Sequence, residues 1–214
     1  MKVISTNISE IREIPYRGKK VKTGIYKYPV LEGIYLERED VKDDNVVDRR
    51  YHGGVDKACY LYGVQPYPFW KGIYPDLEWN YGMFGENLTV LGLDERLLKI
   101  GEQYKIGEAI IEIAQPRQPC YKLGVRFGSQ TIIKKFINTT YSGVYVRVLK
   151  DGLVKSGDIM VCILDKPENP TIEETFFCLY QPEIKRSKLD KIFGCKELAE
   201  SCKKEIKSRL DKLG

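Results

Sequence analysis

The sequence lacks the features by which several classes of protein are recognised. Its 214 residues contain no apolar run close to the ~18 residues that a membrane-spanning helix needs, and the first residues enter a strand-like pattern instead of the apolar core of a signal peptide. The six cysteines form no CxxC pair and show no zinc-ligand spacing, and there is one histidine. We therefore expect a cytoplasmic protein with reduced cysteines and no membrane association.

The chain also lacks the patterns that bind common redox groups. It has neither an iron–sulfur ligand spacing nor a G-x-G-x-x-G fingerprint opening a βαβ unit. If the protein carries out a reduction, its electrons must therefore come from an electron-transfer protein, such as a flavoprotein or an iron–sulfur protein.

The net charge of +5 is concentrated at one end of the chain. Residues 185–214 hold ten Lys and Arg against five Asp and Glu, so the preceding residues are balanced. A basic tail can contact nucleic acid, but here charges of both signs alternate along a helical pattern, which is typical of a solvated helix face. We do not expect nucleic-acid binding.

The apolar pattern predicts a mainly β protein of the α+β class. Residues 1–36 hold short alternating segments separated by glycine and proline, which is typical of a β-barrel or sandwich built from hairpins. A helix opened by Pro66 and an amphipathic helix at residues 129–137 interrupt the strands. Further strands are predicted at residues 58–62, 100–106, 109–114, 143–149 and 158–164.

The period becomes helical after a proline-containing break at residues 166–170, where we place a domain boundary. The β-rich domain covers residues 1–166 and a three-helix domain covers residues 167–214. The three helices are expected from a capping box at residue 171 to about 180, from 187 to 193, and from 196 onward with an apolar stripe that ends at Leu213. Helices this short would be marginal alone, so we expect them to pack on the barrel or on a second subunit, which leaves a homodimer open.

The stretch at residues 115–123, QPRQPCYKL, follows a strand and offers the strongest candidate site. Pro116 and Pro119 stiffen the connection, and Arg117 and Lys122 flank Cys120 with positive charge, which favours a thiolate. The alternative is that Cys120 is a small core residue near a turn. Of the other cysteines, the sequence around 59, 162 and 178 predicts core positions.

A second candidate site lies at residues 49–58, RRYHGGVDKA. Two glycines, Gly53 and Gly54, follow His52 and let the backbone form an anion-binding nest. The cations that would supply charge to this nest are Arg49, Arg50 and Lys57. The alternative interpretation is a well-hydrated hairpin loop.

A third candidate site lies at residues 82–90, where glycines again punctuate a polar segment before a strand. Glu86 and Asn87, next to Gly85, could fix a polar group of a ligand; equally, they could cap a turn.

Taken in order, the three motifs resemble the MOSC domain, named for the C-terminal part of molybdenum-cofactor sulfurase, and more narrowly its YiiM-like branch, in which the barrel precedes a small three-helix segment. The resemblance covers nearly the whole chain. It implies a MOSC-type β-barrel, a pocket for the molybdenum cofactor, and a cysteine, here Cys120, that ligates molybdenum. It also implies a molybdenum-dependent reductase of N-hydroxylated compounds, such as hydroxylaminopurine base analogues, with a role in their detoxification.

The residues agree chemically with that implication. Molybdenum bound by a pterin dithiolene is a soft centre, for which a thiolate is a natural ligand. The pterin phosphate suits the cations and glycine amides of the second site together with Arg117 and Lys122, and the pterin edge suits Glu86 and Asn87. His52 or a tyrosine could supply protons during reduction, and a structural role in a turn is an equal alternative for His52.

Other functions remain open from the residues alone. Cys120 could carry a persulfide for metal–sulfur assembly, since a low-pKa thiol serves that chemistry as well. The pocket could instead bind a cofactor or metabolite without catalysis. A Cys–His hydrolase is weaker, because the sequence shows no third residue to orient the histidine.

Overall fold

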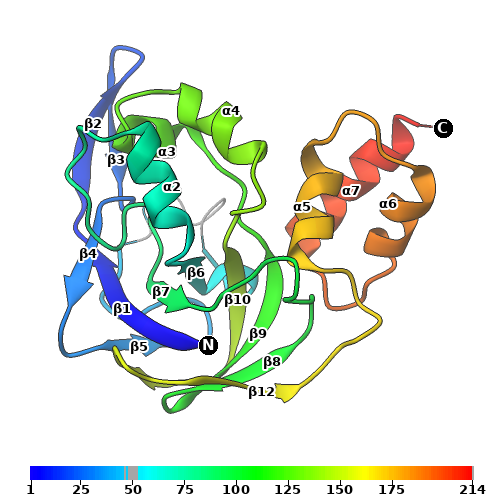
Figure 1. Ribbon diagram of the computed structural model, residues 1–214, viewed down its shortest axis with the longest axis horizontal. Coiled ribbons are helices and arrows are strands. Elements are labelled where there is room, and N and C mark those ends of the chain that lie inside the picture. Colours follow the sequence, from blue (N-terminus) through cyan, green and yellow to red (C-terminus); the bar gives the residue numbers. More distant parts are fainter. Residues whose placement is uncertain (46, 48–52, 214) are drawn as a thin grey trace.

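An eight-stranded sheet is the framework of this computed structural model, which describes residues 1–45, 47 and 53–213. The strand order is β12-β8-β9-β10-β6-β7-β1-β4, and only the neighbours β6 and β7 run parallel. The sheet curls (Figure 1), and a single bridge between Lys2 and Ile159 brings β1 against the residue before β12. No continuous ladder joins β12 to β4 within the described residues, so the barrel is not closed. The predicted mainly β, α+β class is confirmed.

Several strands have the alternation of buried and more exposed side chains that the sequence indicates. In β9, for example, Ile111 and Ile113 are fully buried, and the β8–β9 hairpin over Gly107 forms as predicted. Two small two-stranded sheets, β2–β3 and β5–β11, flank the main one. The strands are β1 (Lys2–Ser9), β2 (Arg12–Tyr16), β3 (Lys19–Thr23), β4 (Lys27–Val30), β5 (Ile34–Leu36), β6 (Cys59–Gly63), β7 (Leu88–Leu91), β8 (Gln103–Ile106), β9 (Ala109–Pro116), β10 (Val144–Lys150), β11 (Gly152–Val154) and β12 (Met160–Leu164).

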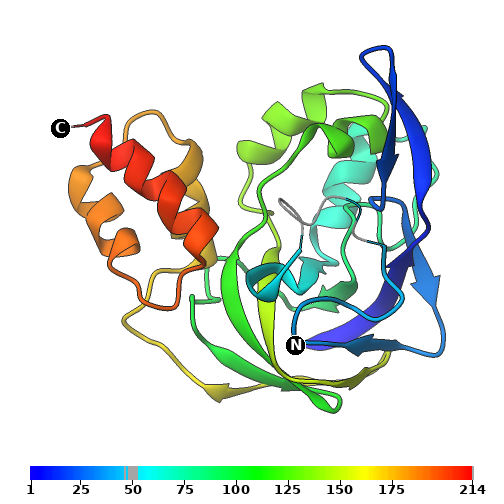
Figure 2. The ribbon, with the colours of Figure 1, turned by 180° about the vertical axis from the view of Figure 1, so that it is seen from behind.

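Helices cover one end of the curled sheet. Here α2, α3 and α4 lie together (Figures 1 and 2) and bury an aromatic cluster that includes Trp70, Phe84 and Phe136. As predicted, Pro66 opens α2. The helical elements are the 3-10 helix η1 (Val55–Lys57), α2 (Pro66–Ile73), α3 (Tyr121–Arg126), α4 (Thr131–Ile137), α5 (Ile172–Tyr180), α6 (Arg186–Phe193) and α7 (Glu200–Asp211).

The three C-terminal helices form where the sequence predicts them and lie beside β9 and β10 in both views of the ribbon. The capping box is present, because Thr171 accepts a hydrogen bond from the Glu174 amide while the Glu174 side chain accepts one from the Thr171 amide. α7 begins at Glu200 rather than at 196, and the stripe ends at Leu210, since Leu213 is 53% exposed.

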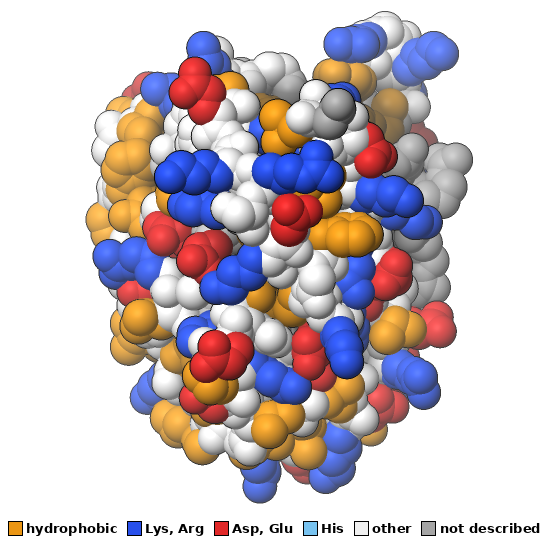
Figure 3. Space-filling model, turned by 90° about the vertical axis from the view of Figure 1, so that its right-hand side faces the viewer, with side chains coloured by type: hydrophobic (Ala, Val, Ile, Leu, Met, Phe, Trp, Pro, Cys, Tyr) orange, Lys and Arg blue, Asp and Glu red, His pale blue; other side chains and the backbone are white. Residues whose placement is uncertain are grey.

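These helices share one apolar core with the sheet, so of the two expected alternatives the one seen in this chain is packing on the β-rich part. The Ala199 amide donates to the Ala114 carbonyl at 3.2 Å, and the Ser201 hydroxyl donates to Gln115 Oε1 at 2.9 Å. The division at residue 166 stays a prediction. Figure 3 views the molecule from the side of these helices and shows cationic and acidic side chains interspersed on that face.

One feature of the core differs from the sequence-based prediction. Cys162 is exposed, although Cys59 and Cys178 are buried as expected, because β12 is an edge strand with little packed over it. After β10 the chain enters β11, which pairs with β5, and β12 pairs with β8. None of the helices in the described part of the chain has the length and apolar character needed to cross a membrane.

Candidate functional site

A cavity lies between the N-terminal strands and the segment that joins β9 to α3. Its walls come from parts of the chain that are distant in sequence, and β-strand pairing brings them together. The lining residues are Thr23, Gly24, Ile25, Lys27, Asp44, Asn45, Val47, Lys57, Ala58, Tyr60, Phe84, Gly85, Asn87, Arg117, Cys120, Lys122 and Tyr145.

All three sequence motifs contribute to this cavity. Of the residues predicted to form the site, one from the second motif, two from the third and three from the first line the cavity. These are Lys57, Gly85, Asn87, Arg117, Cys120 and Lys122. Gly53 and Gly54 are described but are not among the lining residues. The predicted residues Arg49, Arg50 and His52 lie outside the described residues.

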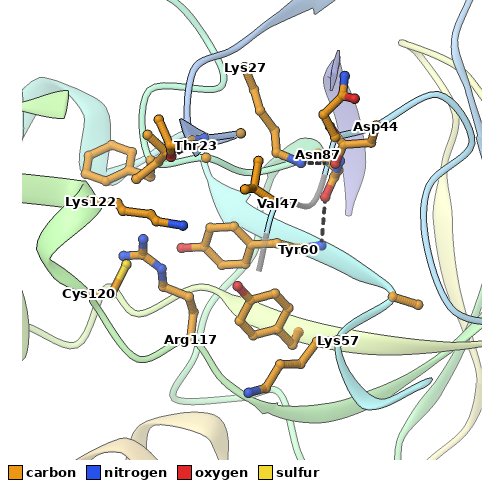
Figure 4. A pocket seen from close by; sticks show the side chains of 17 residues that line it. Thr23, Lys27, Asp44, Val47, Lys57, Tyr60, Asn87, Arg117, Cys120 and Lys122 are labelled. Carbon is orange, nitrogen blue, oxygen red and sulfur yellow. Dashed lines mark hydrogen bonds and ion pairs between the residues drawn. The ribbon is translucent and has the colours of Figure 1, made fainter. Parts of the chain in front are cut away.

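One wall carries Arg117, Cys120 and Lys122, whose side chains gather on one side of the cavity in Figure 4. β9 ends at Pro116, and the Arg117 amide then donates to the carbonyl of Gly143, the residue before the neighbouring strand β10, at 3.4 Å. Cys120 is extended and half-buried, and helix α3 begins directly after it. Lys122 therefore stands on a helix rather than on the predicted loop.

The Arg117 guanidinium is almost fully buried, with 3% of the residue exposed. It lies over the rings of Tyr60 and Phe136, 5.6 and 5.3 Å from their centroids. Its Nη1 atom is buried and has no hydrogen-bond partner among the described residues. A buried donor without a partner is costly, so this atom marks a place where a ligand acceptor would be bound favourably.

The opposite wall carries a buried ion pair that the sequence analysis did not identify. Lys27 Nζ contacts Asp44 Oδ2, and the side chains are only 8% and 2% exposed. Asp44 also accepts the Ser9 amide at 2.9 Å, the Ser9 hydroxyl at 2.7 Å and Asn87 Nδ2 at 2.8 Å. Burial opposes ionisation of this carboxyl, but the charge of Lys27 and these hydrogen bonds outweigh it, so the pKa of Asp44 is lowered.

Two tyrosines lie between the walls, and neither was singled out from the sequence. Tyr60 donates its hydroxyl to the Ser142 carbonyl at 2.9 Å, and burial raises its pKa well above the ordinary value. Burial likewise raises the pKa of Tyr145 to about 12, although the nearby charge of Arg117 opposes this shift. Both phenols are therefore neutral at physiological pH.

Comparison with known proteins identifies the family. The model of the MOSC domain matches residues 48–161. A Bacillus subtilis (strain 168) protein named "Uncharacterized protein YflK" is 33% identical over 211 residues, which cover 99% of this chain and 95% of the relative. The chain belongs to the MOSC domain family.

Two further relatives extend the comparison of this MOSC protein. The crystal structure of YiiM from Geobacillus stearothermophilus has a TM-score of 0.81 and 26% identity, covering 98% of each chain. A Gibberella moniliformis (strain M3125 / FGSC 7600) protein named "Reductase" is 32% identical over 154 residues, which cover 70% of this chain but 27% of that protein. These relationships indicate a function related to the molybdenum cofactor and, at a coarse level, an oxidoreductase-like role.

Glu86 has a different position in this MOSC domain from the one expected. It is fully buried, and its carboxylate accepts hydrogen bonds from the Gly82 amide at 2.8 Å, the Phe84 amide at 3.1 Å and the Thr89 hydroxyl at 2.8 Å, as well as from the Tyr67 hydroxyl. The group therefore holds its own turn together instead of facing the cavity.

Asn87 does line the cavity, but its amide is already engaged within the protein. Its Oδ1 accepts the Tyr60 amide at 3.2 Å, while its Nδ2 donates to Asp44. Of the two polar residues in this motif, one lies behind the wall and the other braces it.

The charges of the cavity suit an anionic ligand. Lys57, Arg117 and Lys122 line it together with the neutralised Lys27–Asp44 pair. Burial lowers the pKa of Lys57, although Glu205 and Asp56 oppose this. The described residues contain no cluster of three or more His, Cys, Asp or Glu that could hold a metal ion, so a metal at Cys120 would take its other ligands from a bound group.

Proposed function

We propose that this protein is a molybdenum-cofactor-dependent reductase of N-hydroxylated compounds, with Cys120 as the protein ligand to molybdenum. The observation that carries the proposal is the cavity itself, which is lined by a half-buried thiol and by three cations from two motifs, Lys57 from one and Arg117 and Lys122 from the other. The MOSC family and the relative named "Reductase" support the same class of chemistry.

The residues fit the cofactor. The part of the chain that the structure describes offers Cys120 but no cluster of metal-ligating side chains, and this suits a metal that is already held by a dithiolene. The phosphate of the pterin is an acceptor of the kind that Arg117 Nη1 lacks, and Lys122 and Lys57 add charge near it. We therefore assign the anionic end of the cofactor to the Arg117 and Lys122 wall.

When bound, the cofactor supplies the centre that takes up and delivers two electrons. The overall reaction converts R–NHOH, two electrons and two protons into R–NH2 and water, so one N–O bond breaks. Among the described residues, we favour the Tyr145 hydroxyl as the proton donor, because its pKa of about 12 keeps it protonated. The Tyr60 hydroxyl already donates its hydrogen to the Ser142 carbonyl. His52, which lies outside the described residues, stays a second candidate.

The experiment compares two cysteine variants after expression in a host that makes the molybdenum cofactor. Cys120→Ala should lose stoichiometric molybdenum and the reduction of 6-hydroxylaminopurine. Cys162→Ala, which removes an exposed thiol from edge strand β12, should keep both. Full activity in Cys120→Ser would remove the metal-ligand role.

The same preparations test the main alternative. The cations around a half-buried Cys120 could also stabilise a persulfide anion. Sulfane sulfur on Cys120, found without molybdenum, would identify a sulfur carrier instead of a reductase.

A further inference from the structure

The β2–β3 hairpin carries a strong local excess of positive charge. Between residues 12 and 23 there are five Lys and Arg and one carboxylate, whereas the whole chain has 35 against 30. The hairpin forms a two-stranded sheet of its own and rises away from the main sheet at the top left of Figure 1. The side chains of Arg17, Lys19, Lys20 and Lys22 are exposed.

The turn of this hairpin places a cation at a strained position. Arg17 and Gly18 occupy the turn with φ of +49° and +75°, the combination that a two-residue hairpin turn requires. Asparagine or glycine meets that requirement with less strain than a long side chain does. An arginine at the outermost point of the hairpin is therefore not explained by local folding.

The tip of the hairpin lies against the proposed metal site. The ring of Tyr16 stacks on Tyr121, with centroids 4.1 Å apart and planes at 25°, and Tyr121 is the residue directly after Cys120. The Arg17 guanidinium lies over the Tyr16 ring of this stacked pair, 5.4 Å from its centroid. Lys19 is paired with Tyr16 in register and so shares its face.

The base of the hairpin also belongs to the site, because Thr23 lines the cavity. The hairpin thus runs from the cavity wall to the residue beside Cys120. We define the basic hairpin tip as Arg17, Lys19 and Lys20.

We propose that the basic hairpin tip is the docking surface for an acidic electron-transfer protein. This inference rests on the proposed reductase function, which requires electrons from a partner. Cations at the edge of a redox site steer an acidic donor toward it and orient it, and redox complexes are typically small and transient. A surface that binds nucleic acid would not need to touch the residue next to the reactive thiol.

The electron count follows from the reduction. Each N–OH group reduced consumes two electrons and two protons and releases one amine and one water. An acidic flavodoxin supplies the electrons in two successive contacts, and each hydroquinone is oxidised to the semiquinone.

Direct binding tests the surface without any dependence on catalysis. We would measure binding of a strongly acidic bacterial flavodoxin to the protein by calorimetry at low and physiological salt. Lys19→Glu with Lys20→Glu should weaken binding at least about tenfold, and salt should weaken wild-type binding. The matched control reverses the charges of Lys105 on β8 and Lys150 at the end of β10, which are both exposed, and should change binding little. Strands β8 and β10 lie apart from the β2–β3 hairpin in Figure 1.

Activity then separates this inference from the proposed function. With dithionite or a reduced viologen as donor, the hairpin variant should reduce 6-hydroxylaminopurine as fast as wild type, while with flavodoxin its apparent KM for the donor should rise at least about tenfold. If the wild-type protein reduced no substrate with any of these donors, the reductase proposal would be overturned. The flavodoxin binding measurement would still test the docking surface, because it does not depend on catalysis.

Three results would overturn the docking surface. These are wild-type protein that reacts with small reductants but neither binds nor accepts electrons from flavodoxin, a hairpin variant with unchanged flavodoxin binding, and an equal loss in the Lys105 and Lys150 control. Loss of oligonucleotide binding in the hairpin variant, with flavodoxin binding unchanged, would show a nucleic-acid surface instead.

Discussion

Replacing Asp44 by Asn should lower the free energy of unfolding by about 3–5 kcal/mol, because it leaves the charge of Lys27 buried without a partner. Both side chains are less than a tenth exposed, so water can solvate the remaining charge only poorly. An amide oxygen can still accept from Ser9, and therefore most of the loss comes from the ion pair rather than from the Ser9 hydrogen bonds.

Urea unfolding at neutral pH measures this loss, and two variants sharpen it. Lys27→Met combined with Asp44→Asn removes the stranded charge and should recover a large part of the stability lost in Asp44→Asn. Asp94→Asn breaks the pair with Arg96, whose side chain is 66% exposed, and should leave the unfolding midpoint almost unchanged. A loss below about 1 kcal/mol in Asp44→Asn, or a double variant no more stable than it, would refute a strongly coupled buried pair.

The pH dependence of stability gives an independent check on Asp44. Its pKa is lowered in the folded state from the ordinary value of 3.8, since Lys27 and the hydrogen bonds outweigh burial. A carboxyl with a depressed folded-state pKa contributes stability above its unfolded-state pKa and loses it as pH falls through the folded-state value. Below about pH 4, the stability of wild type should therefore fall more steeply than that of Asp44→Asn.

Three further predictions concern residues that support the cavity from behind. Burial raises the pKa of Glu95 to about 7 in the folded protein, so the free energy of unfolding should fall as the pH rises from about 4.5 to 7. Glu95→Gln should remove this pH dependence, which is measured as the difference between the unfolding midpoints at pH 5 and pH 8. Glu86→Gln should cost about 1–3 kcal/mol in urea unfolding, because its NH2 group must face a donor, and an unchanged midpoint would contradict the carboxylate network. Gly143→Ala should destabilise the fold and weaken cofactor retention, because φ is +63° and a Cβ would lie 2.5 Å from the Leu61 carbonyl and 2.7 Å from the Tyr60 ring. Gly152 is similarly crowded but does not line the cavity, so Gly152→Ala controls for destabilisation alone.

Local sequence patterns predicted the helices and strands of this fold better than they predicted which strands pair with one another. The capping box at Thr171 and the hairpin over Gly107 depend on a few adjacent residues, and both form as expected. The pairing of β12 with β8 and of β11 with β5 depends on how the sheet curls, which adjacent residues do not encode. Cys162 is exposed because β12 is an edge strand of that sheet. The sequence could not show this, because an apolar run on an edge strand has the same pattern as a buried strand.

The site shows the same division. Lys57, Arg117, Cys120 and Lys122 belong to compact motifs and line one cavity, but the Lys27–Asp44 pair joins segments with no shared motif. A signal for Lys27 did exist, because it stands two residues after the apolar Ile25, and side chains two residues apart in an extended segment lie on the same face. Lysine at such a position is rarely buried unless it is paired, and that rule predicts a carboxylate partner without naming Asp44.

The two walls of the cavity differ in how much of their charge is available to a ligand. Asp44 neutralises Lys27 and also accepts hydrogen bonds from Asn87 and Ser9, so this wall is held rigidly and offers little net charge. Among the described residues, no carboxylate forms an ion pair with Arg117 or Lys122, and Arg117 Nη1 lacks an acceptor. Attraction for an anionic group is therefore strongest on the wall that also holds Cys120.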